Sequence, residues 1–218
     1  MGTTYINVDN EYMVEMLERY GYIKSDRVKS AFMAVDRADF VPEEYRKKAY
    51  FDDPLPIGHG QTISAPSMVA IMLELLEIFE GSKVLEIGTG SGYNACLMAC
   101  MGAKVYTIER IPALRDLAKR NMKKCPSKDR VIILLGDGSI GYKQEAPYDR
   151  IIVTCGAPEI PKPLLEQLKD PGILVIPIGG TFFQELYVIR KKRGKIIKRP
   201  WGEVAFVPLI GRYGHRWA

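Results

Sequence analysis

The chain has 218 residues and a mass of 24.6 kDa, and 47% of its residues are hydrophobic, so it can bury one sizeable core. Its net charge of +5, from 31 Lys and Arg against 26 Asp and Glu, is low for a dedicated nucleic-acid binder, and we expect no nucleic-acid partner. No uncharged run reaches membrane-spanning length, and the first ten residues lack an apolar signal core. We therefore expect a cytoplasmic protein without a membrane partner. A monomer is expected, although the sequence does not fix the oligomeric state.

Two amphipathic helices are predicted near the N-terminus. Asn10 can cap the first, which runs through Tyr20 and stops at Gly21. Ser25 can cap the second, whose apolar face includes Phe32. Both helices need a surface to pack on, and they could cover a ligand pocket or join subunits.

Residues 42–65 are rich in Pro and Gly, which predicts an ordered loop with little regular structure. Such loops often carry binding or catalytic residues. Pro66 stands where a first helical turn would start, and residues 68–79 then repeat apolar side chains at helical spacing.

From Lys83 onward, predicted strands alternate with predicted helices. Strands are expected at residues 84–87, 104–108, 131–134, 150–153, 173–178, 185–190 and 195–199. Helices are expected at residues 93–101, 112–124 and 162–169. The alternation predicts an α/β fold with a mostly parallel, seven-stranded sheet and helices on both faces. The basic run at residues 190–195 surrounds the last turn, which favours a solvated hairpin tip over a binding patch.

The cysteines suggest neither a metal site nor a disulfide. Their positions are Cys96, Cys100, Cys125 and Cys155, without a Cys-x-x-Cys pair. Because His59 and His215 are the only histidines, a zinc site is hard to assemble, and we expect no metal. Buried reduced thiols are the expected state.

Residues 84–93 form an apolar strand that ends in an acid, followed by Gly88, Gly90 and Gly92 and by a helix start. Glycines allow a sharp turn and a close approach to a ligand, although an ordinary glycine-rich turn is the alternative. A dinucleotide motif would place its third glycine at position 93, where this chain has Tyr93. A nicotinamide cofactor is therefore disfavoured, and Glu86 suits a cationic ligand.

Acids also follow the next two strands. Glu109 can accept hydrogen bonds from both hydroxyls of a ribose, although it could instead pair with Arg110. Asp137 could accept from an adenine amino group, although Gly-Asp-Gly is also common in simple turns. Since ligands of such sheets lie beyond the carboxyl ends of the strands, three acids at three strand ends favour an adenosyl ligand.

The segment from Glu86 to Gly92 resembles the first motif of class I methyltransferases that use S-adenosylmethionine. The loop from Pro54 to Pro66 closely resembles the signature of the protein-L-isoaspartate O-methyltransferases. Further similar segments are residues 84–93, 136–138, 149–158, 172–179 and 206–209, so the resemblance covers nearly all of residues 25–211.

The resemblance implies a Rossmann-like class I methyltransferase fold whose last two strands are exchanged relative to most of that class. It implies a single domain over residues 1–218, with an N-terminal helical cap and substrate loop at 1–80 and a Rossmann-like core at 81–218. The implied activity is methyl transfer from S-adenosylmethionine to the α-carboxyl of L-isoaspartyl residues in damaged proteins and peptides, which leaves S-adenosyl-L-homocysteine. The methyl ester then closes to a succinimide, which can reopen to aspartate.

The resemblance also implies residue roles. Ser64 matches the active-site serine of the family. The implied cofactor-binding residues are Thr62, Ile63, Ala65, Glu86, Ile87, Gly88, Thr89, Gly90, Gly92, Glu109, Arg110, Asp137 and Gly138. The implied substrate-binding residues are Thr62, Ser64, Val207, Pro208 and Leu209. Ala205 stands where many members have Arg, a departure on the substrate side.

The implied chemistry agrees with the residues available. A peptide carboxyl has a pKa near ~3.5, so the acceptor is already an anion at neutral pH and needs no general base. A catalytic His or Cys is therefore not expected, and His59 should be structural or solvent-facing. The Ser64 hydroxyl can hold one carboxylate oxygen while amides at the next helix start attract the anion, or it can simply cap that helix.

Two other functions remain open. One is a class I methyltransferase for another substrate, such as nucleic acid. Enzymes that methylate base amines usually present Asn or Asp, then Pro-Pro and an aromatic residue, after the fourth strand, where this chain has residues 154–157, Thr-Cys-Gly-Ala. The other is a non-enzymatic adaptor that recognises isoaspartate, for which the chain is short.

Overall fold

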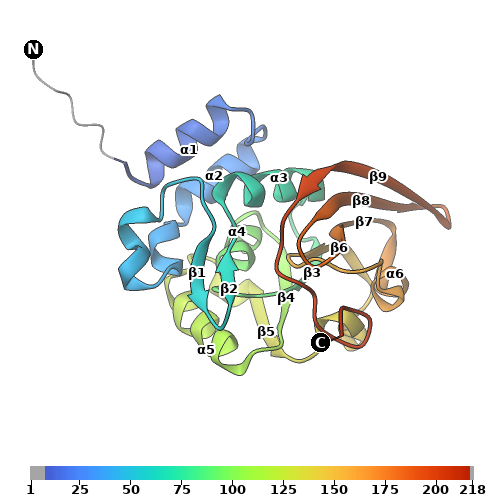
Figure 1. The fold of residues 1–218 in the computed structure, drawn as a ribbon. Coiled ribbons are helices and arrows are strands. Elements are labelled where there is room, and N and C mark those ends of the chain that lie inside the picture. Colours follow the sequence, from blue (N-terminus) through green and yellow to red (C-terminus); the bar gives the residue numbers. More distant parts are fainter. Residues whose placement is uncertain (1–7, 217–218) are drawn as a thin grey trace, which may run out of the picture.

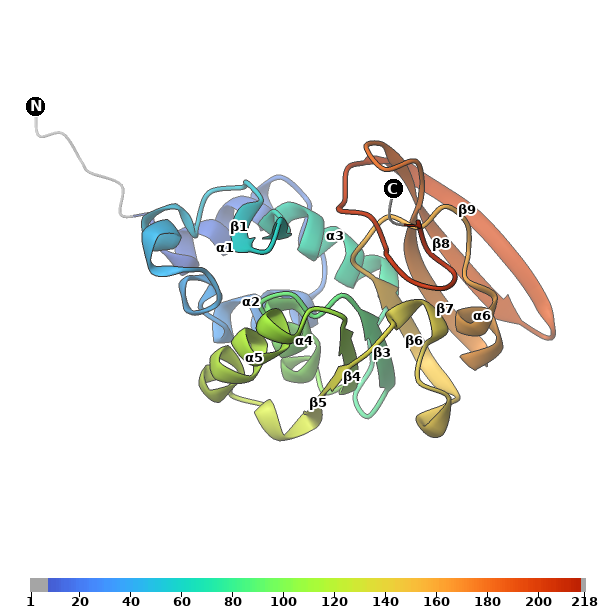
Figure 2. The same cartoon turned by 60° about the horizontal axis from the view of Figure 1, so that its bottom comes forward.

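A computed structural model describes residues 8–216, so the expectations for the first residues lie mostly outside it. Seven strands form one sheet in the order β5-β4-β3-β6-β7-β8-β9 (Figure 2). Their bounds are β3 Lys83–Ile87, β4 Lys104–Glu109, β5 Val131–Leu135, β6 Tyr148–Val153, β7 Leu168–Gly179, β8 Gln184–Lys192 and β9 Lys195–Val204. The strands from β5 to β7 are parallel, and β8 and β9 are antiparallel additions. The mostly parallel, seven-stranded sheet is confirmed, and β9 lies at the edge after β8, as the implied exchange requires.

Each face of the sheet packs against its own hydrophobic cluster. Strand side chains alternate, so Val84 belongs to one cluster and Leu85 to the other. The first cluster includes residues of the two N-terminal helices and of α3 to α5, and the second includes Leu164 of α6. The bounds are α3 Pro66–Leu76, α4 Tyr93–Cys100, α5 Pro112–Asn121 and α6 Lys162–Gln167, with short 3-10 turns at η3 Met122–Lys124, η4 Lys128–Arg130, η5 Gly138–Ile140 and η6 Lys143–Glu145. Helices thus cover both faces, unequally.

The N-terminal helices are α1 Asn10–Arg19 and α2 Asp26–Ala34, followed by the 3-10 turn η1 Arg37–Phe40 (Figure 1). Ser25 caps α2 as predicted, but the cap of α1 is Asp9, whose carboxylate accepts from the Tyr12 amide at 3.0 Å. Asn10 instead donates from its side chain to the Phe32 carbonyl at 2.8 Å. The prediction for Asn10 was wrong because the longer-range contact between α1 and α2 uses its amide group.

The N-terminal helices pack against the glycine-loop side of the core. The rings of Phe32 and Phe40 lie 6.1 and 5.5 Å from the buried ring of Tyr93 at the start of α4. Tyr93 stands where a dinucleotide motif would have its third glycine. Its ring packs the N-terminal segment against the start of α4, next to the sheet. None of the described residues forms a helix long and apolar enough to cross a membrane.

The segment 42–65 has more regular structure than its composition predicts. It contains the 3-10 turn η2 Glu43–Lys48 and an antiparallel hairpin of β1 Leu55–Gly58 and β2 Gln61–Ile63. Pro56 is tolerated because the hairpin stands apart from the main sheet, and buried side chains alternate with exposed ones along β1. His59 turns the chain with a φ of 54° and is exposed, in agreement with the solvent-facing role expected for it.

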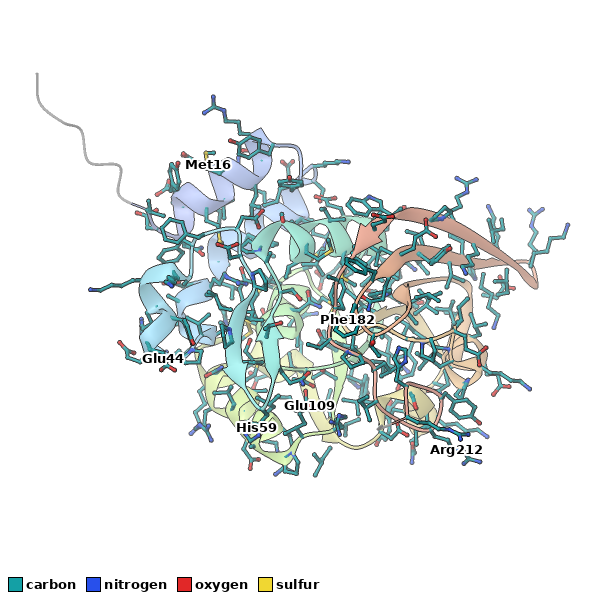
Figure 3. The ribbon with its side chains drawn as sticks, viewed as in Figure 1. Met16, Glu44, His59, Glu109, Phe182 and Arg212 are labelled. Carbon is teal, nitrogen blue, oxygen red and sulfur yellow. A yellow bond between two sulfur atoms is a disulfide. The ribbon has the colours of Figure 1, made fainter. Side chains whose placement is uncertain are left out.

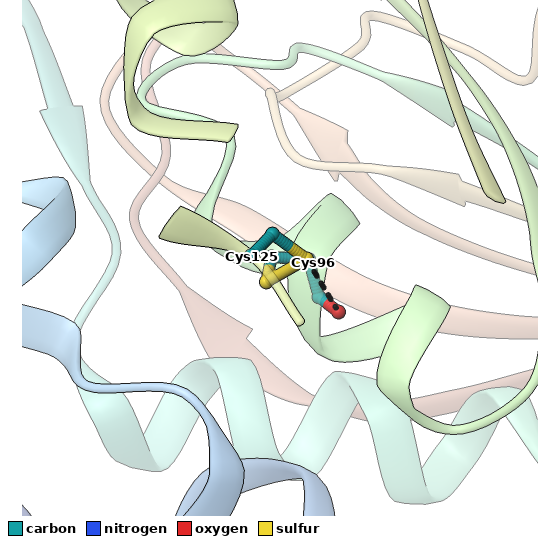
Figure 4. Close-up of a disulfide and its surroundings, with 2 residues drawn as sticks. All are labelled: Cys96 and Cys125. Carbon is teal, nitrogen blue, oxygen red and sulfur yellow. Dashed lines mark hydrogen bonds between the residues drawn. A yellow bond between two sulfur atoms is a disulfide. The ribbon is translucent and has the colours of Figure 1, made fainter. Parts of the chain in front are cut away.

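Cys96 of α4 and Cys125, which follows η3, form a disulfide across 29 residues (Figure 4). The prediction of reduced thiols was therefore wrong for these two residues. The pairing depends on the chain folding back from α5 onto α4, a tertiary contact that spacing alone does not reveal. Cys100 and Cys155 are free, and the Cys100 sulfur lies within 4.8 Å of the other two.

The basic run lies at a hairpin tip, as predicted. Arg193 and Gly194 both have positive φ, and their amides donate to the Asp170 carboxylate at 2.8 and 2.6 Å. Arg190 pairs with Glu77 on the surface. These contacts are those of a solvated turn held to the neighbouring β7.

Candidate active site

The glycine loop leaves β3 at the carboxyl edge of the sheet. Gly88 has a φ of +96°, and a Cβ there would lie 2.5 Å from Thr154 Oγ1. That hydroxyl donates to the carbonyls of Ile87 and Gly88 at 3.0 and 2.8 Å, which ties the loop to the end of β6. A side chain is therefore excluded at position 88, where the loop passes the end of β6, and the backbone of the loop forms the floor of the site.

The three strand-end acids have different surroundings. Glu109 accepts from the amides of Gly90 and Ile111, both at 3.0 Å, and each carboxylate oxygen keeps a further lone pair. Glu86 is fully buried and accepts from the Asn94 side chain at 2.8 Å. Burial raises the pKa of Glu86 to about 7, against the lowering effect of its hydrogen bonds to Thr107 and Asn94.

Asp137 is held by the C-terminal segment. One carboxylate oxygen accepts from the amide and hydroxyl of Ser139 at 2.9 and 2.7 Å, and the other accepts from the Arg212 amide at 2.8 Å. The Asp137 carboxylate thus stabilises a turn, which is the alternative role that the Gly-Asp-Gly sequence suggests. Asp137 could contact a ligand only through a carboxylate lone pair that these three hydrogen bonds leave free.

Two adjoining hollows open around the glycine loop. The main hollow, with a volume of about 560 Å³, lies between the β1–β2 hairpin, the strand ends and residues 207–210. The side hollow, of about 450 Å³, lies between the hairpin, α3 and the start of α4. Both are lined by Thr62, Gly88, Gly90 and Thr154. The hairpin therefore folds over the carboxyl edge of the sheet, beside the glycine loop.

The two hollows gather most of the site residues expected from the sequence. The main hollow is lined by Thr62, Ile87, Gly88, Gly90, Glu109, Arg110, Gly138, Val207, Pro208 and Leu209. The side hollow adds Ile63, Ser64 and Thr89. Neither is lined by Ala65, Glu86, Gly92 or Asp137, although Asp137 and Arg110 border a separate outer hollow near Gly211. Figure 3 labels Glu109 below the centre of the molecule and His59 at the tip of the β1–β2 hairpin.

Ser64 is positioned by residues distant in the sequence. Arg37 is fully buried and donates to the carbonyls of Ser64 and Asp53 at 2.8 and 3.2 Å. Desolvation lowers the pKa of Arg37 to about 10. The Asp52 carboxylate accepts from the Ser67 amide at 2.8 Å, in the first turn of α3. The N-cap residue of α3 is Ala65, which follows Ser64 and has no side-chain hydrogen bond to the helix. The Ser64 hydroxyl is therefore not the cap of α3.

Arg37 and Asp52 were missed because no local pattern links them to Ser64. Sequence reasoning also missed the wall of the main hollow, formed by Ile108, Ile111, Leu114, Thr154 and Cys155. Burial raises the pKa of the Cys155 thiol, so this thiol is a neutral wall and not a nucleophile. This wall could have been predicted from the apolar residues at the ends of the predicted strands and at the start of the following helix.

The residues present fit S-adenosylmethionine. Among the described residues, Asn94 Oδ1 and Glu86 Oε2 are buried acceptors without a partner, and an ammonium group supplies the donors they lack. Asn94 lines the side hollow, so an amino group could reach it there. Glu109 offers acceptors to hydroxyls, and the apolar wall of the main hollow suits a flat ring.

The sheet, the glycine loop at its carboxyl edge and the acid at the end of β4 define a class I methyltransferase. The model of the protein-L-isoaspartate(D-aspartate) O-methyltransferase family matches residues 8–214. The chain belongs to this family.

Similar proteins extend over almost the whole chain. It is 54% identical to the protein-L-isoaspartate O-methyltransferase of Hyperthermus butylicus, over 94% of this chain and 89% of that one. Identity to the Pyrococcus abyssi protein of the same name is 55%, over 93% and 95% of the two chains. A crystal structure of a Plasmodium falciparum relative in complex with S-adenosyl-L-homocysteine superimposes with a TM-score of 0.83 at 32% identity, covering 94% of this chain and 99% of that one. The protein is accordingly an S-adenosylmethionine-dependent isoaspartyl O-methyltransferase.

Proposed function

We propose that Ser64 holds the α-carboxylate of an isoaspartyl residue while residues 207–209 bind the substrate backbone. The juxtaposition of the hairpin and the glycine loop around shared hollows carries this proposal. When bound, S-adenosylmethionine supplies an electrophilic methyl group on a sulfonium. The acceptor carboxylate is already ionised, so the residues of this chain need only orient it and exclude water.

Orientation is the main contribution we assign to the protein. The acceptor oxygen must lie about 3 Å from the methyl carbon, and holding reactants in such a geometry can supply on the order of 7 kcal/mol. Ser64 donates one hydrogen bond to the carboxylate, and its own position is fixed through Arg37. The amide of Ser67 already donates to Asp52, so fewer helix-start amides are left for the anion than the sequence suggested.

On the cofactor side, we propose that Glu109 accepts from the ribose hydroxyls and that Asn94 and Glu86 receive the amino group. The remaining lone pairs of Glu109 and the unpartnered oxygens of Asn94 and Glu86 support these roles. Gly88, Gly90 and their neighbours allow the close approach of the ligand. The methyl ester formed then closes to a succinimide without further help from the protein.

The test is a paired assay with labelled S-adenosylmethionine and two peptides that differ only in isoaspartate against aspartate. Methyl transfer to the isoaspartyl peptide alone is expected. Equal transfer to both peptides would overturn the proposed substrate side and favour a methyltransferase of another substrate. Failure to bind S-adenosylmethionine in calorimetry would favour the adaptor.

We also propose that the protein acts as a cytoplasmic monomer on isoaspartyl proteins and peptides. The expected site residues that line the two hollows all come from one chain, so the proposed site does not require a second subunit. Light scattering coupled to gel filtration gives the mass, for which about 25 kDa is expected from the 24.6 kDa chain.

A further inference from the structure

The loop between β7 and β8 carries two adjacent phenylalanines that contact little of the protein. Phe182 and Phe183 are each 80% exposed, more than any other large hydrophobic residue in the described range. Side chains so exposed gain little from burial on folding, so their presence is not explained by the stability of this chain. Adjacent exposed aromatic residues are typical of a surface that binds another molecule.

This loop emerges at the carboxyl end of β7, the edge of the sheet that holds the site. Short backbone contacts connect it to the C-terminal segment. The Gly179 amide donates to Ala157 at 2.9 Å, while Gly156 exchanges hydrogen bonds with Val207 at 2.8 Å and Leu209 at 2.7 Å. Val207 and Leu209 line the main hollow. Residues 156 and 157 therefore connect the start of the loop, through backbone hydrogen bonds, to the segment proposed to bind the substrate backbone.

Gln184 fixes the loop beside that segment. This side chain is 3% exposed, and its amide group donates to the Gly180 carbonyl at 2.6 Å while its oxygen accepts from the Phe206 amide at 2.7 Å. Both ends of the phenylalanine pair are thus anchored without using the two rings. In the view of Figure 3, Phe182 is labelled near the centre of the molecule, above the labels of Glu109 and His59.

We propose that Phe182 and Phe183 form an aromatic rim that binds apolar side chains adjacent to the isoaspartyl residue of the substrate. The inference rests on the proposed function, because an isoaspartyl residue held by Ser64, with its backbone along residues 207–209, brings its flanking residues toward the rim. Continuity with the 207–209 segment selects a polypeptide substrate as the occupant over a second copy of this chain. Apolar flanking side chains are accessible mainly in unfolded segments, so the rim favours damaged proteins that have lost local structure.

The experiment compares kcat/KM for two isoaspartyl peptides, one flanked by Leu and Phe and the other by Gly and Ser. The wild-type enzyme should prefer the apolar peptide by about tenfold, mainly through KM. The F182S/F183S double variant should lose this preference, so that the ratio of the two values falls about tenfold. Because the two side chains are exposed, the melting temperature of the variant should stay within about 2 °C of the wild type.

The matched control is the I196S/I197S double variant. Ile196 and Ile197 are each 45% exposed and pair with Lys191 and Arg190, at the opposite end of the sheet. This variant removes two exposed apolar residues and should keep the wild-type ratio. The proposal is overturned if F182S/F183S keeps the preference, if the wild type has none, or if F182S/F183S changes only the oligomeric state. Failure of the proposed function is distinct, since the wild type would then methylate neither isoaspartyl peptide.

Discussion

The two sides of the pocket are held by different kinds of contact. On the cofactor side, residues 88–92 are fixed by backbone geometry and by neighbouring strand ends, as in the hydrogen bond from the Gly90 amide to Glu109. On the substrate side, Ser64 depends on Arg37 and Asp52, which lie 27 and 12 residues earlier and act through side chains. Changes distant in the sequence should therefore weaken substrate methylation while leaving cofactor binding intact.

The largest effect is expected for Arg37→Met. The carbonyls of Ser64 and Asp53 would lose their charged donor inside the protein, at a cost of about 3–5 kcal/mol in the free energy of unfolding. Chemical denaturation measures this loss, and calorimetry should show an S-adenosylmethionine affinity within about tenfold of wild type. Arg46→Met, which removes a partly exposed arginine with surface ion pairs, is the control and should change stability by less than ~1 kcal/mol. An equal loss of cofactor affinity and turnover in Arg37→Met would contradict the separation of the two sides.

The next effect is a pH dependence that belongs to the cofactor side. The pKa of Glu86 is raised to about 7, so between about pH 4.5 and 7 the folded protein keeps a proton that the unfolded chain has released. Stability from this group is full below pH 4.5 and is lost as the pH rises through 7, on the order of 3 kcal/mol in all. Denaturation curves give the free energy of unfolding at pH 5 and at pH 8. The difference between these two free energies should be smaller for Glu86→Gln than for the wild type. An unchanged difference between the two pH values would show that Glu86 ionises normally.

Much of the cofactor side could be predicted from the sequence, because its signals are local. The spacing of Gly88, Gly90 and Gly92 and the acid at each strand end follow from strand and turn geometry alone. The substrate side could be predicted only through the family resemblance. The hairpin at 55–63, the role of Arg37 and the Cys96–Cys125 disulfide depend on contacts between distant segments, which no local pattern encodes. The direct cofactor contacts all stay predictions, and those of Ala65, Glu86, Gly92 and Asp137 have the least support because these residues line neither the main nor the side hollow.

A smaller effect is expected for Gly88→Ala, which tests the cofactor side directly. The new Cβ would meet Thr154 Oγ1 at 2.5 Å on a residue with positive φ, and we expect a loss of about 2 kcal/mol in stability together with weaker S-adenosylmethionine binding. The matched variant is Gly21→Ala, which has positive φ but an open space around the added Cβ. Differential scanning calorimetry measures the stability of both variants, and titration calorimetry measures their affinity for S-adenosylmethionine. Comparing the two variants separates the effect of backbone strain from that of the clash. Equal cofactor affinity in the two variants would remove the role of the close approach at Gly88.

The smallest effect is expected for Asp52→Ala. Loss of the hydrogen bond to the Ser67 amide should cost about 1 kcal/mol, as for other helix caps, and should raise KM for the peptide because Ser64 lies next to that turn. Asp9→Ala removes the cap of α1 and is the control, because Asp9 lines neither the main nor the side hollow. Both variants should lose similar stability, and only Asp52→Ala should change KM. A shift of KM in both would indicate a general effect of helix fraying.

The most direct test of the account is Ser64→Ala assayed with the isoaspartyl peptide. We predict that turnover falls at least tenfold, while the affinity for S-adenosylmethionine measured by calorimetry stays within about tenfold of the wild type. Wild-type turnover in Ser64→Ala would contradict the claim that this residue orients the acceptor carboxylate.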